Sequence, residues 1–298
     1  MPQTLAVSIV IPSYRRERVL LETLSSLLAL PTPAAELLVV DQTEQHERAT
    51  GQALEAMHDR GQIRWLRLTE PSIPQAMNAG LLHASQPLVL FLDDDIRPEP
   101  SLVAAHCAAH QAHPGTLVAG RVLQPWDEGR DFSNDGHFHF ASGKPAWINE
   151  FMGGNFSVDR LAAIALGGFD ENFVRVAYRF EAEFAHRARA GGMRIHFEPA
   201  ACLHHLKVAA GGTRTYGEHL TSWRADHSVG AYYFALRTGA ARDFALRPCR
   251  AIATRYHLRH PWRIPATLLA ELGGMIWALR LFMRGPRHLR HPPTNAPA

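Results

Sequence analysis

The sequence predicts an α/β protein whose sheet is mostly parallel and flanked by helices. Short runs of β-branched and aliphatic residues alternate along the chain with longer segments in which leucines recur at helical spacing. Acidic residues follow directly after two of these apolar runs. Such positions suit ligand binding, because ligands of open α/β sheets bind at the carboxyl ends of the strands.

Each predicted element has a local signal of its own. The run at 7–11 is continuously apolar and ends at Pro12, and the leucines at 17–30 keep helical spacing until Pro31 stops them. The same alternation then predicts strands at 36–40, 63–68 and 88–92, and helices at 50–59 and 74–84.

The second half of the chain is less regular. Residues 118–160 are rich in glycine, aromatic and turn residues, which predicts loops and short mixed strands, and helical patterns return at 158–166 and 179–189. After residue 215 the helices become rich in Arg, His and Trp. We therefore predict an α/β domain at 1–215, a helical extension at 216–298 and, within it, a disordered tail at 291–298.

Composition limits the class of protein. Hydrophobic residues make up 46% and charged residues 20% of the 298 residues, and a formal net charge of +3 gives no support for nucleic-acid binding. Three cysteines without CxxC spacing favour a reducing compartment. Glu271 and Arg280 interrupt the apolar stretch at 266–283, so we expect it to be too short to span a bilayer and the chain to be cytoplasmic.

The strongest chemical signal is Asp93-Asp94-Asp95, which follows the apolar run at 88–92. Three adjacent carboxylates repel one another unless water or a cation surrounds them, and Mg²⁺ or Mn²⁺ prefers such oxygen ligands. Two other readings stay open at this point. The residues could form an acidic turn before a helix, or an aspartate cluster of a phosphoryl-transfer enzyme.

The order of several motifs resembles the family 2 glycosyltransferases over roughly residues 7–215. VSIVIPSYRR is similar to the first strand and sugar-donor loop of that family, and LLVVDQT to its second strand. AMNAGLLHA, FLDDD, GGNFSV and GGFDENF follow in the family's order. The resemblance implies the GT-A fold, with its Rossmann-like sheet, and transfer of a sugar with inversion from a nucleoside-diphosphate sugar to a hydroxyl acceptor.

The resemblance also implies roles for single residues. Asp41 would accept a hydrogen bond from the base, Asp93 would lie near the ribose, and Asp95 would bind Mn²⁺ or Mg²⁺ beside the diphosphate. His205, in the His204-His205 pair that ends a strand-like segment, is the better match to a family histidine and would be a second metal ligand. The remaining residues implied to bind the sugar donor are Pro12, Ser13, Tyr14, Arg15, Asn78 and Asp94.

One position departs from the family pattern. Met77 stands where the family has an arginine before the asparagine of the helix, which here is Asn78. We hypothesise that Arg214, in the Gly-rich stretch at 211–214, supplies the missing positive charge. Asn78 could still hold a loop through its side-chain hydrogen bonds.

The segment that follows Gly167-Gly168 carries the candidate general base. Aligning its later residues with the family places Glu181 at the base position and Phe180 where the family has a glutamate. A carboxylate within hydrogen-bond reach of a hydroxyl suffices for this role. Glu183, two residues later, is the alternative base, and its structural role would be pairing with Arg187 four residues further on.

Other features have weaker implications. His106 and His110 lie four apart on a predicted helix, but the glutamate of the zincin motif is missing, so we expect a solvated helix face. Arginines and tryptophans after residue 216 predict either peripheral contact with an anionic membrane or a helical cap with a basic face.

The sequence leaves the acceptor open: a glycan, a polysaccharide or a glycolipid precursor. A nucleotidyltransferase is disfavoured because no glycine-rich loop follows the first strand. A catalytically inactive nucleotide-sugar-binding protein or a scaffold of a membrane-associated assembly remains the alternative function.

Overall fold

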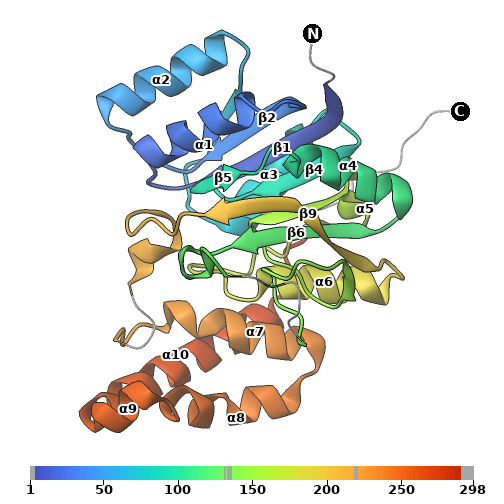
Figure 1. Cartoon of the computed structure of the whole chain (residues 1–298). Coiled ribbons are helices and arrows are strands. Elements are labelled where there is room, and N and C mark those ends of the chain that lie inside the picture. The colour runs from blue at the N-terminus through green and yellow to red at the C-terminus, as the bar shows by residue number, and fades with distance from the viewer. Residues whose placement is uncertain (1–3, 131, 133–135, 218–220, 290–298) are drawn as a thin grey trace, which may run out of the picture.

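The computed structural model describes residues 4–130, 132, 136–217 and 221–289. A single sheet runs through the α/β part in the strand order β3-β2-β1-β4-β8-β6-β9-β5, with β7 paired to β9. In Figure 1, α2 lies at the top of the molecule and α1 beside β1 and β2, α6 lies below β6, and the C-terminal helices form a further layer beneath α6.

The first half of the sheet is parallel, as the sequence predicts. Its strands are β1 (Leu5–Ser13), β2 (Ala34–Asp41), β3 (Arg64–Arg67) and β4 (Leu88–Leu92). The helices that connect or follow them are α1 (Arg18–Leu28), α2 (Arg48–Asp59), α3 (Ile73–His83) and α4 (Leu102–Ala112). Because all four strands run in one direction, their carboxyl ends meet at one edge of the sheet.

The second half of the sheet contains both parallel and antiparallel pairs, whereas we expected a mostly parallel sheet. β6 and β9 are parallel, whereas the pairs β4–β8, β6–β8, β5–β9 and β7–β9 are antiparallel. The bounds of these strands are β5 (Ile96–Pro98), β6 (Leu117–Leu123), β7 (Ala146–Ile148), β8 (Asn155–Asp159) and β9 (Ile195–His205).

The expected helix at 158–166 is partly wrong. Phe156 and Val158 alternate with polar residues and pair with β4, so the chain is a strand up to Asp159. Only α5 (Arg160–Ala165) is helical, and it begins where the Asp159 side chain accepts a hydrogen bond from the Ala162 backbone.

Buried apolar side chains cover both faces of the sheet. On β1, Ile9 and Ile11 point into the cluster under α1 and α4, and Val10 points into the cluster that includes α3 and α6. This division follows from the two-residue period of a strand. α6 (Phe180–Ala190) presents Phe184 to the second cluster, so the helix that carries the candidate base is fixed on the core.

The prediction of a solvated face at His106 is wrong. Its side chain is completely buried between α4 and β8, where Nε2 lies 2.9 Å from Asn155 Oδ1 and Nδ1 lies 2.8 Å from Ser157 Oγ. His110 reaches the same serine hydroxyl at 2.8 Å. Burial lowers the pKa of His106 to about 3 and that of His110 to about 4, so both are neutral near pH 7.

The C-terminal helices pack below α6. They are α7 (Val229–Thr238), α8 (Ala241–Ile252), α9 (Arg255–Arg259) and α10 (Ile264–Met283), with short 3₁₀ turns at Pro125–Asp127, Gly212–Tyr216, Ala225–His227 and Pro261–Arg263. Tyr232 and Tyr233 of α7 belong to the same core cluster as α6. The boundary at 215/216 stays a prediction, but the core continues across it, and the tail predicted at 291–298 lies outside the described residues.

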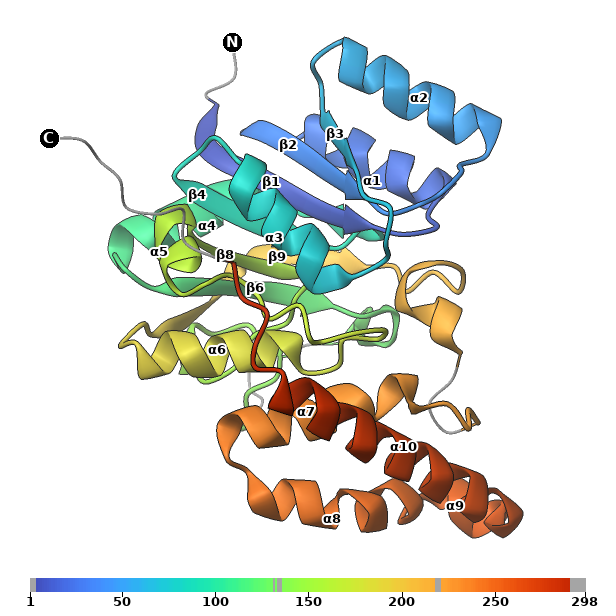
Figure 2. The same cartoon turned by 180° about the vertical axis from the view of Figure 1, so that it is seen from behind.

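Two features of the C-terminal part were not expected. The helical stretch Pro261–Met283 contains an 18-residue window with a mean hydropathy of 1.4, so by length and composition it could cross a membrane, contrary to the expectation from Glu271 and Arg280. After α10 the chain runs back along α6 toward α5 (Figure 2). There the Leu289 amide donates to Gly167 and the Glu171 amide donates to Arg287, which fastens the loop between α5 and α6.

Candidate active site

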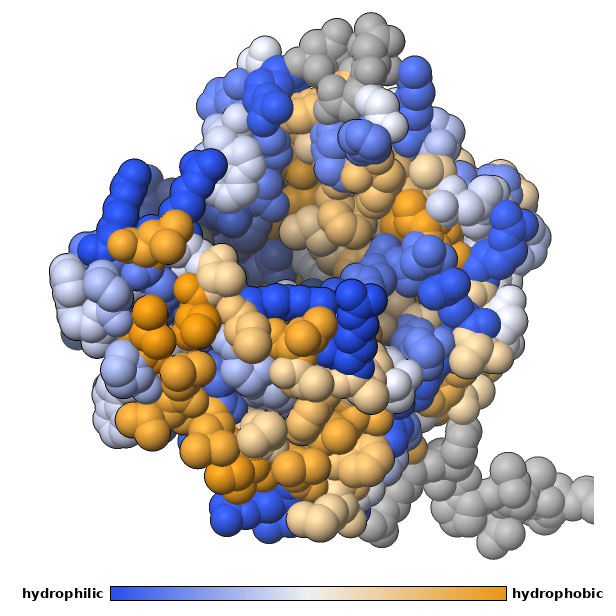
Figure 3. All heavy atoms as spheres, turned by 90° about the horizontal axis from the view of Figure 1, so that it is seen from below, coloured by the Kyte–Doolittle hydropathy of each residue, from blue (hydrophilic) through white to orange (hydrophobic). Residues whose placement is uncertain are grey.

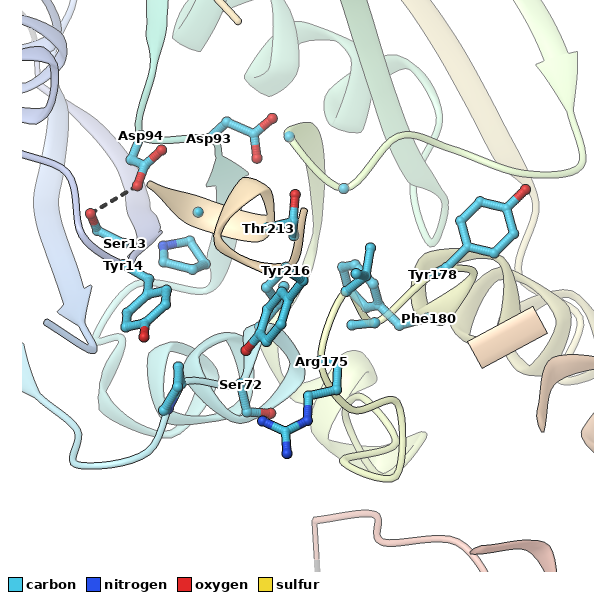
Figure 4. A pocket seen from close by; sticks show the side chains of 18 of the residues that line it. Ser13, Tyr14, Ser72, Asp93, Asp94, Arg175, Tyr178, Phe180, Thr213 and Tyr216 are labelled. Atoms are coloured by element: carbon cyan, nitrogen blue, oxygen red, sulfur yellow. Dashed lines mark hydrogen bonds between the residues drawn. The ribbon is translucent and has the colours of Figure 1, made fainter. Parts of the chain in front are cut away.

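A cavity of about 480 Å³ opens at the carboxyl edge of the parallel strands. β1 brings Ser13 there, β4 brings Asp93 to Asp95, and β9 brings His205. Figure 4 shows Ser13 hydrogen-bonded to Asp94, with Asp93 beside them and Tyr178 and Phe180 on the opposite side. The sequence-predicted residues that line the cavity are Pro12, Ser13, Tyr14, Asp93, Asp94, Asp95, Glu181 and His205.

Asp93, Asp95 and His205 form a cluster that could hold a metal ion. Their ligand atoms lie within 4.8 Å of one another, with His205 Nε2 at 3.2 Å from Asp95 Oδ1 and 3.9 Å from Asp93 Oδ2. Gln124 Oε1 lies 3.2 Å from His205 Nδ1 and thereby orients the ring. Two carboxylates and an oriented imidazole are a donor set that fits Mn²⁺ or Mg²⁺.

Charge within this cluster shifts its pKa values. Burial by itself raises the pKa of Asp95, but the hydrogen bond with His205 and the charge of Arg16 outweigh it and leave the pKa below its ordinary value. Burial also acts to lower the pKa of His205, yet its bond to Asp95 and the charge of Asp93 raise it. Burial raises the pKa of Asp93, so Asp95 is the member of the cluster whose surroundings favour the ionised carboxylate.

Arg16 is a site residue that the sequence analysis missed. It is buried; its Nε donates to Asp94 at 3.0 Å and its Nη2 donates to Asp95 at 3.2 Å. Its Nη1 also donates to the carbonyls of Val208 and Ala210, which ties the loop after β9 to the aspartates. The signal for it was electrostatic, since two buried carboxylates require a counter-charge.

The neighbouring Arg15 does not line the cavity. Its side chain is exposed and lies over the ring of Tyr14, and its backbone amide donates to Thr43 Oγ1. Arg16 and not Arg15 lines the cavity, and the sugar-donor role predicted for Arg15 stays a prediction. Arg214 lies in the turn Gly212–Tyr216, and its side chain is outside what the structure describes.

The glycine pair of the GGNFSV motif has a steric reason. Gly154 accepts a backbone hydrogen bond from Asp93, and a Cβ on Gly154 would lie 2.0 Å from Asp93 Oδ2. Any side chain at this position would displace the carboxylate. Gly154 directly precedes β8, which pairs antiparallel with β4. The same glycine therefore leaves room for the Asp93 carboxylate and leads the chain into the strand beside β4.

Asp41 and Asn78 lie away from the lining of the cavity. Asp41 is completely buried at the end of β2, and its Oδ2 contacts His46 Nε2 at 2.7 Å and accepts from Trp65 Nε1 at 3.0 Å. These two side chains contact the same carboxylate oxygen, and Asp41 is not among the residues that line the cavity, so its contact with a base stays a prediction.

Asn78 has a structural function. Its Nδ2 donates to the Phe169 carbonyl at 2.9 Å and to Glu171 Oε1 at 3.1 Å, and its Oδ1 accepts from the Phe169 amide at 2.8 Å. The asparagine therefore holds the loop before α6, as its hydrogen-bonding capacity allowed, and it is not among the residues that line the cavity, so the sugar-donor contact predicted for it stays a prediction. Its neighbour Met77 does line the cavity, where Arg175 and Lys207 bring positive charge.

The two candidate bases differ in their surroundings. Glu183 is buried and forms a bidentate pair with Arg187 at 2.7 and 2.9 Å, which is the pairing predicted from their spacing. Glu181 lines the cavity, and burial raises its pKa to about 7, with the nearby charge of Asp93 adding to the shift. A carboxylate with a pKa near 7 suits proton transfer at neutral pH.

The backbone before Glu181 is strained. Arg175, Ala177 and Arg179 have φ values of 62°, 53° and 75°, in the left-handed region that residues with a Cβ rarely adopt. Each such residue costs of order 1 kcal/mol, and such residues concentrate at functional sites. The strained segment separates the cavity from a second one of about 640 Å³ between α7, α8 and α10, and Val176, Tyr178 and His227 line both.

Solved structures share this fold. Over 93% of this chain and 83% of the other, the structure resembles S. aureus TarS in complex with UDP-GlcNAc, with a TM-score of 0.65 and 17% identity. Over 96% and 81%, it resembles the mannosyltransferase PcManGT from Pyrobaculum calidifontis in complex with GDP-Man and Mn²⁺, with a TM-score of 0.56 and 21% identity. At these identities the likeness shows the fold, which is that of GT-A glycosyltransferases.

Sequence comparison gives the family. A validoxylamine A glucosyltransferase from Streptomyces hygroscopicus subsp. limoneus is 30% identical over 117 residues, which cover 38% of this chain and only 26% of that relative. The model of glycosyl transferase family 2 matches residues 8–172, more than half of the chain. The matched region contains the three aspartates, Gly154 and the Asn78-anchored loop. The chain therefore belongs to glycosyl transferase family 2.

Proposed function

We propose that the protein transfers a sugar from a nucleoside-diphosphate sugar to a hydroxyl acceptor, with inversion at the anomeric carbon. The observation that carries this proposal is the arrangement of one cavity. Asp93, Asp95 and His205, which could together hold a cation, line it with Glu181, whose pKa of about 7 suits a general base. Family membership and the sugar-nucleotide complexes of its structural neighbours support the same activity.

Mn²⁺ or Mg²⁺ would be held by Asp93, Asp95 and His205. When bound, such an ion stabilises the negative charge that develops on the leaving diphosphate. The Mn²⁺ in the PcManGT complex supports a divalent ion, and the imidazole in the cluster favours Mn²⁺ over Mg²⁺. Arg16 keeps Asp94 and Asp95 in place, and Arg175 lies on the cavity wall where it can neutralise phosphate in place of the arginine that Met77 replaces.

Glu181 would act on the acceptor. Its carboxylate takes the proton of the hydroxyl group while the hydroxyl oxygen attacks the anomeric carbon, and the bond from that carbon to the diphosphate oxygen breaks. A single displacement inverts the configuration and needs no second nucleophile. We propose that the acceptor enters from the 640 Å³ cavity, because Tyr178 and Val176 form a wall common to both cavities next to Glu181.

A screen of nucleotide sugars by thermal shift tests the donor site. A nucleotide sugar that binds the folded state raises the melting temperature, and we expect this only with Mn²⁺ present. The Asp95→Ala variant should lose the metal-dependent part of the rise in melting temperature, because removing a metal ligand or its support weakens metal binding by about 10- to 100-fold. If no nucleotide sugar shifts the wild type with any divalent ion, the proposal is refuted.

A second assay separates binding from catalysis. The nucleotide sugar that binds is incubated with the wild type and with Glu181→Gln, and release of nucleoside diphosphate is measured with candidate acceptors and with water. Wild-type turnover that falls in Glu181→Gln, with binding retained, supports the transferase. Binding without transfer or hydrolysis would instead support the inactive nucleotide-sugar-binding protein, for which Met77 in the cavity wall is the observation in favour.

A further inference from the structure

The distribution of side chains around α10 is inverted relative to a water-exposed helix. Large apolar residues recur at helical spacing on its exposed face: Leu268, Leu269, Leu272, Ile276, Leu279 and Met283. Its buried face carries mainly small or polar residues: Thr267, Ala270, Glu271, Gly274 and Ala278. A helix packed on a soluble core normally has the opposite arrangement. Outward aliphatic residues with small residues at the contacts are typical of helices that face lipid.

The apolar face continues beyond α10. Leu258 on α9 is 83% exposed, and Trp262 lies in the turn between the two helices with its ring exposed as well. Figure 3, which views the molecule from below, shows apolar side chains gathered in a continuous area on this face, with strongly polar side chains at its margin. Contiguous apolar surface of this kind marks an interaction site.

Arginines flank the apolar face at both ends of α10. Arg255, Arg259 and Arg263 precede the helix, and Arg280 and Arg284 lie in or after its last turn. All five are exposed, and within the described residues none has a carboxylate within 4.0 Å. Exposed cations around an apolar area complement a surface that is apolar inside and anionic outside.

We infer that α9, the turn Pro261–Arg263 and α10 dock this face on an anionic lipid surface. The occupant is a bilayer rather than a second copy of the chain, because a copy would bring its own unpaired arginines against these arginines. The aliphatic side chains enter the headgroup boundary, and the arginine side chains extend to the lipid phosphates. The cytoplasmic leaflet supplies such lipids, in keeping with the cytoplasmic location expected from the sequence.

α10 lies in the plane of the membrane in this arrangement. It packs lengthwise on α7 and α8, and the buried Glu271 in its middle pairs with Arg247 of α8 at 3.0 Å. A Cβ on Gly274 would lie 2.1 Å from Ser228 Oγ, so the helix is also in close contact with the residue before α7. These contacts hold one side of α10 on the protein and leave the other side for lipid. Thr267, Ala270 and Glu271 also line the 640 Å³ cavity.

Vesicle co-sedimentation of the full chain tests the inference, without sugar donor or acceptor. We expect the wild type to bind phosphatidylcholine vesicles that contain phosphatidylglycerol, and to be released by high salt. Leu269→Glu with Leu272→Glu should weaken binding at least about tenfold, because it places charge in the apolar face. Arg255→Gln with Arg259→Gln should weaken it by roughly fivefold per residue.

Leu161→Glu on α5 is the matched control, because Leu161 and Leu269 are both 67% exposed and only Leu269 lies on the proposed face. It should bind vesicles like the wild type. Unchanged melting temperatures and nucleotide-sugar shifts show that the variants are folded, so failure here is distinguishable from failure of the proposed activity. The inference is overturned if the wild type does not bind anionic vesicles, or if the variant with Leu269→Glu and Leu272→Glu binds them like the wild type. It is also overturned if light scattering shows that these two substitutions dissociate a dimer.

Discussion

The pKa of Glu181 gives a quantitative test of its role as base. Burial raises this pKa to about 7, and the smaller contribution of Asp93 acts in the same direction. A base works in its deprotonated form, so activity should fall as the pH drops through the pKa. At pH 6 about one tenth of the groups would be deprotonated for a pKa of 7, against nearly all for an ordinary glutamate. We therefore expect kcat/KM to fall about tenfold between pH 8 and pH 6.

The assay measures nucleoside diphosphate release at limiting acceptor and saturating Mn²⁺ from pH 5 to pH 9. A cation bound near Asp93 would offset only the contribution of Asp93 to the raised pKa of Glu181. Most of the rise should remain, because burial is its largest cause. Glu181→Gln should lower kcat by about 10²- to 10⁴-fold at every pH, the usual contribution of a general base. Glu181→Asp should keep part of the activity, since it retains the carboxylate.

Glu198→Gln serves as the control, because Glu198 is a half-buried glutamate on β9 outside the cavity lining. It should leave both the rate and the pH profile unchanged. A wild-type profile that stays flat from pH 8 to pH 5, or a Glu181→Gln variant that retains wild-type kcat, would refute the assignment of Glu181 as the base.

Three further predictions follow from single contacts. Gly154→Ala should abolish the Mn²⁺-dependent nucleotide-sugar shift, because its Cβ would lie 2.0 Å from Asp93 Oδ2. The pKa of His106 is about 3 in the folded protein and 6.5 in the unfolded chain, so its contribution to stability is present above pH 6.5 and is lost as the pH falls. Denaturant titration should show that this residue makes the protein about 2 kcal/mol less stable at pH 5 than at pH 7. Asn78→Ala should lower the free energy of unfolding by about 2–3 kcal/mol, because Phe169 loses two buried hydrogen bonds.

Matched variants check these three expectations. Gly153→Ala, whose Cβ would lie 3.1 Å from Phe180, should keep more of the nucleotide-sugar shift than Gly154→Ala, and equal loss would contradict the steric argument. His106→Gln should reduce the difference in stability between pH 7 and pH 5, whereas substitution of the exposed His186 should not. An Asn78→Ala variant with wild-type stability would show that the loop before α6 is held by other contacts.

The elements of the first half of the chain, and the order in which site residues follow them, could be predicted from the sequence alone. Strand and helix periods are local properties, so the parallel strands and the acidic ends of β4 were predictable within a few residues. The placement of Ser13, Asp93, Asp95, His205 and Glu181 around one cavity follows from the same patterns and from the family resemblance. These residues come from different elements, but each stands at a strand end or helix start that its neighbours in sequence define.

Tertiary structure decided the partners of the buried polar groups. Arg16 rather than Arg15 faces the aspartates, and the backbone at Arg15 has the left-handed φ of 53°, which no sequence pattern here indicated. Asp41 and His106 are enclosed by residues distant in sequence, which no local pattern specifies. The outward face of α10 could not be predicted from the sequence either. The contacts of this apolar helix with α7 and α8 decide which of its sides is buried. Periodicity is local, whereas burial and charge pairing depend on the whole fold.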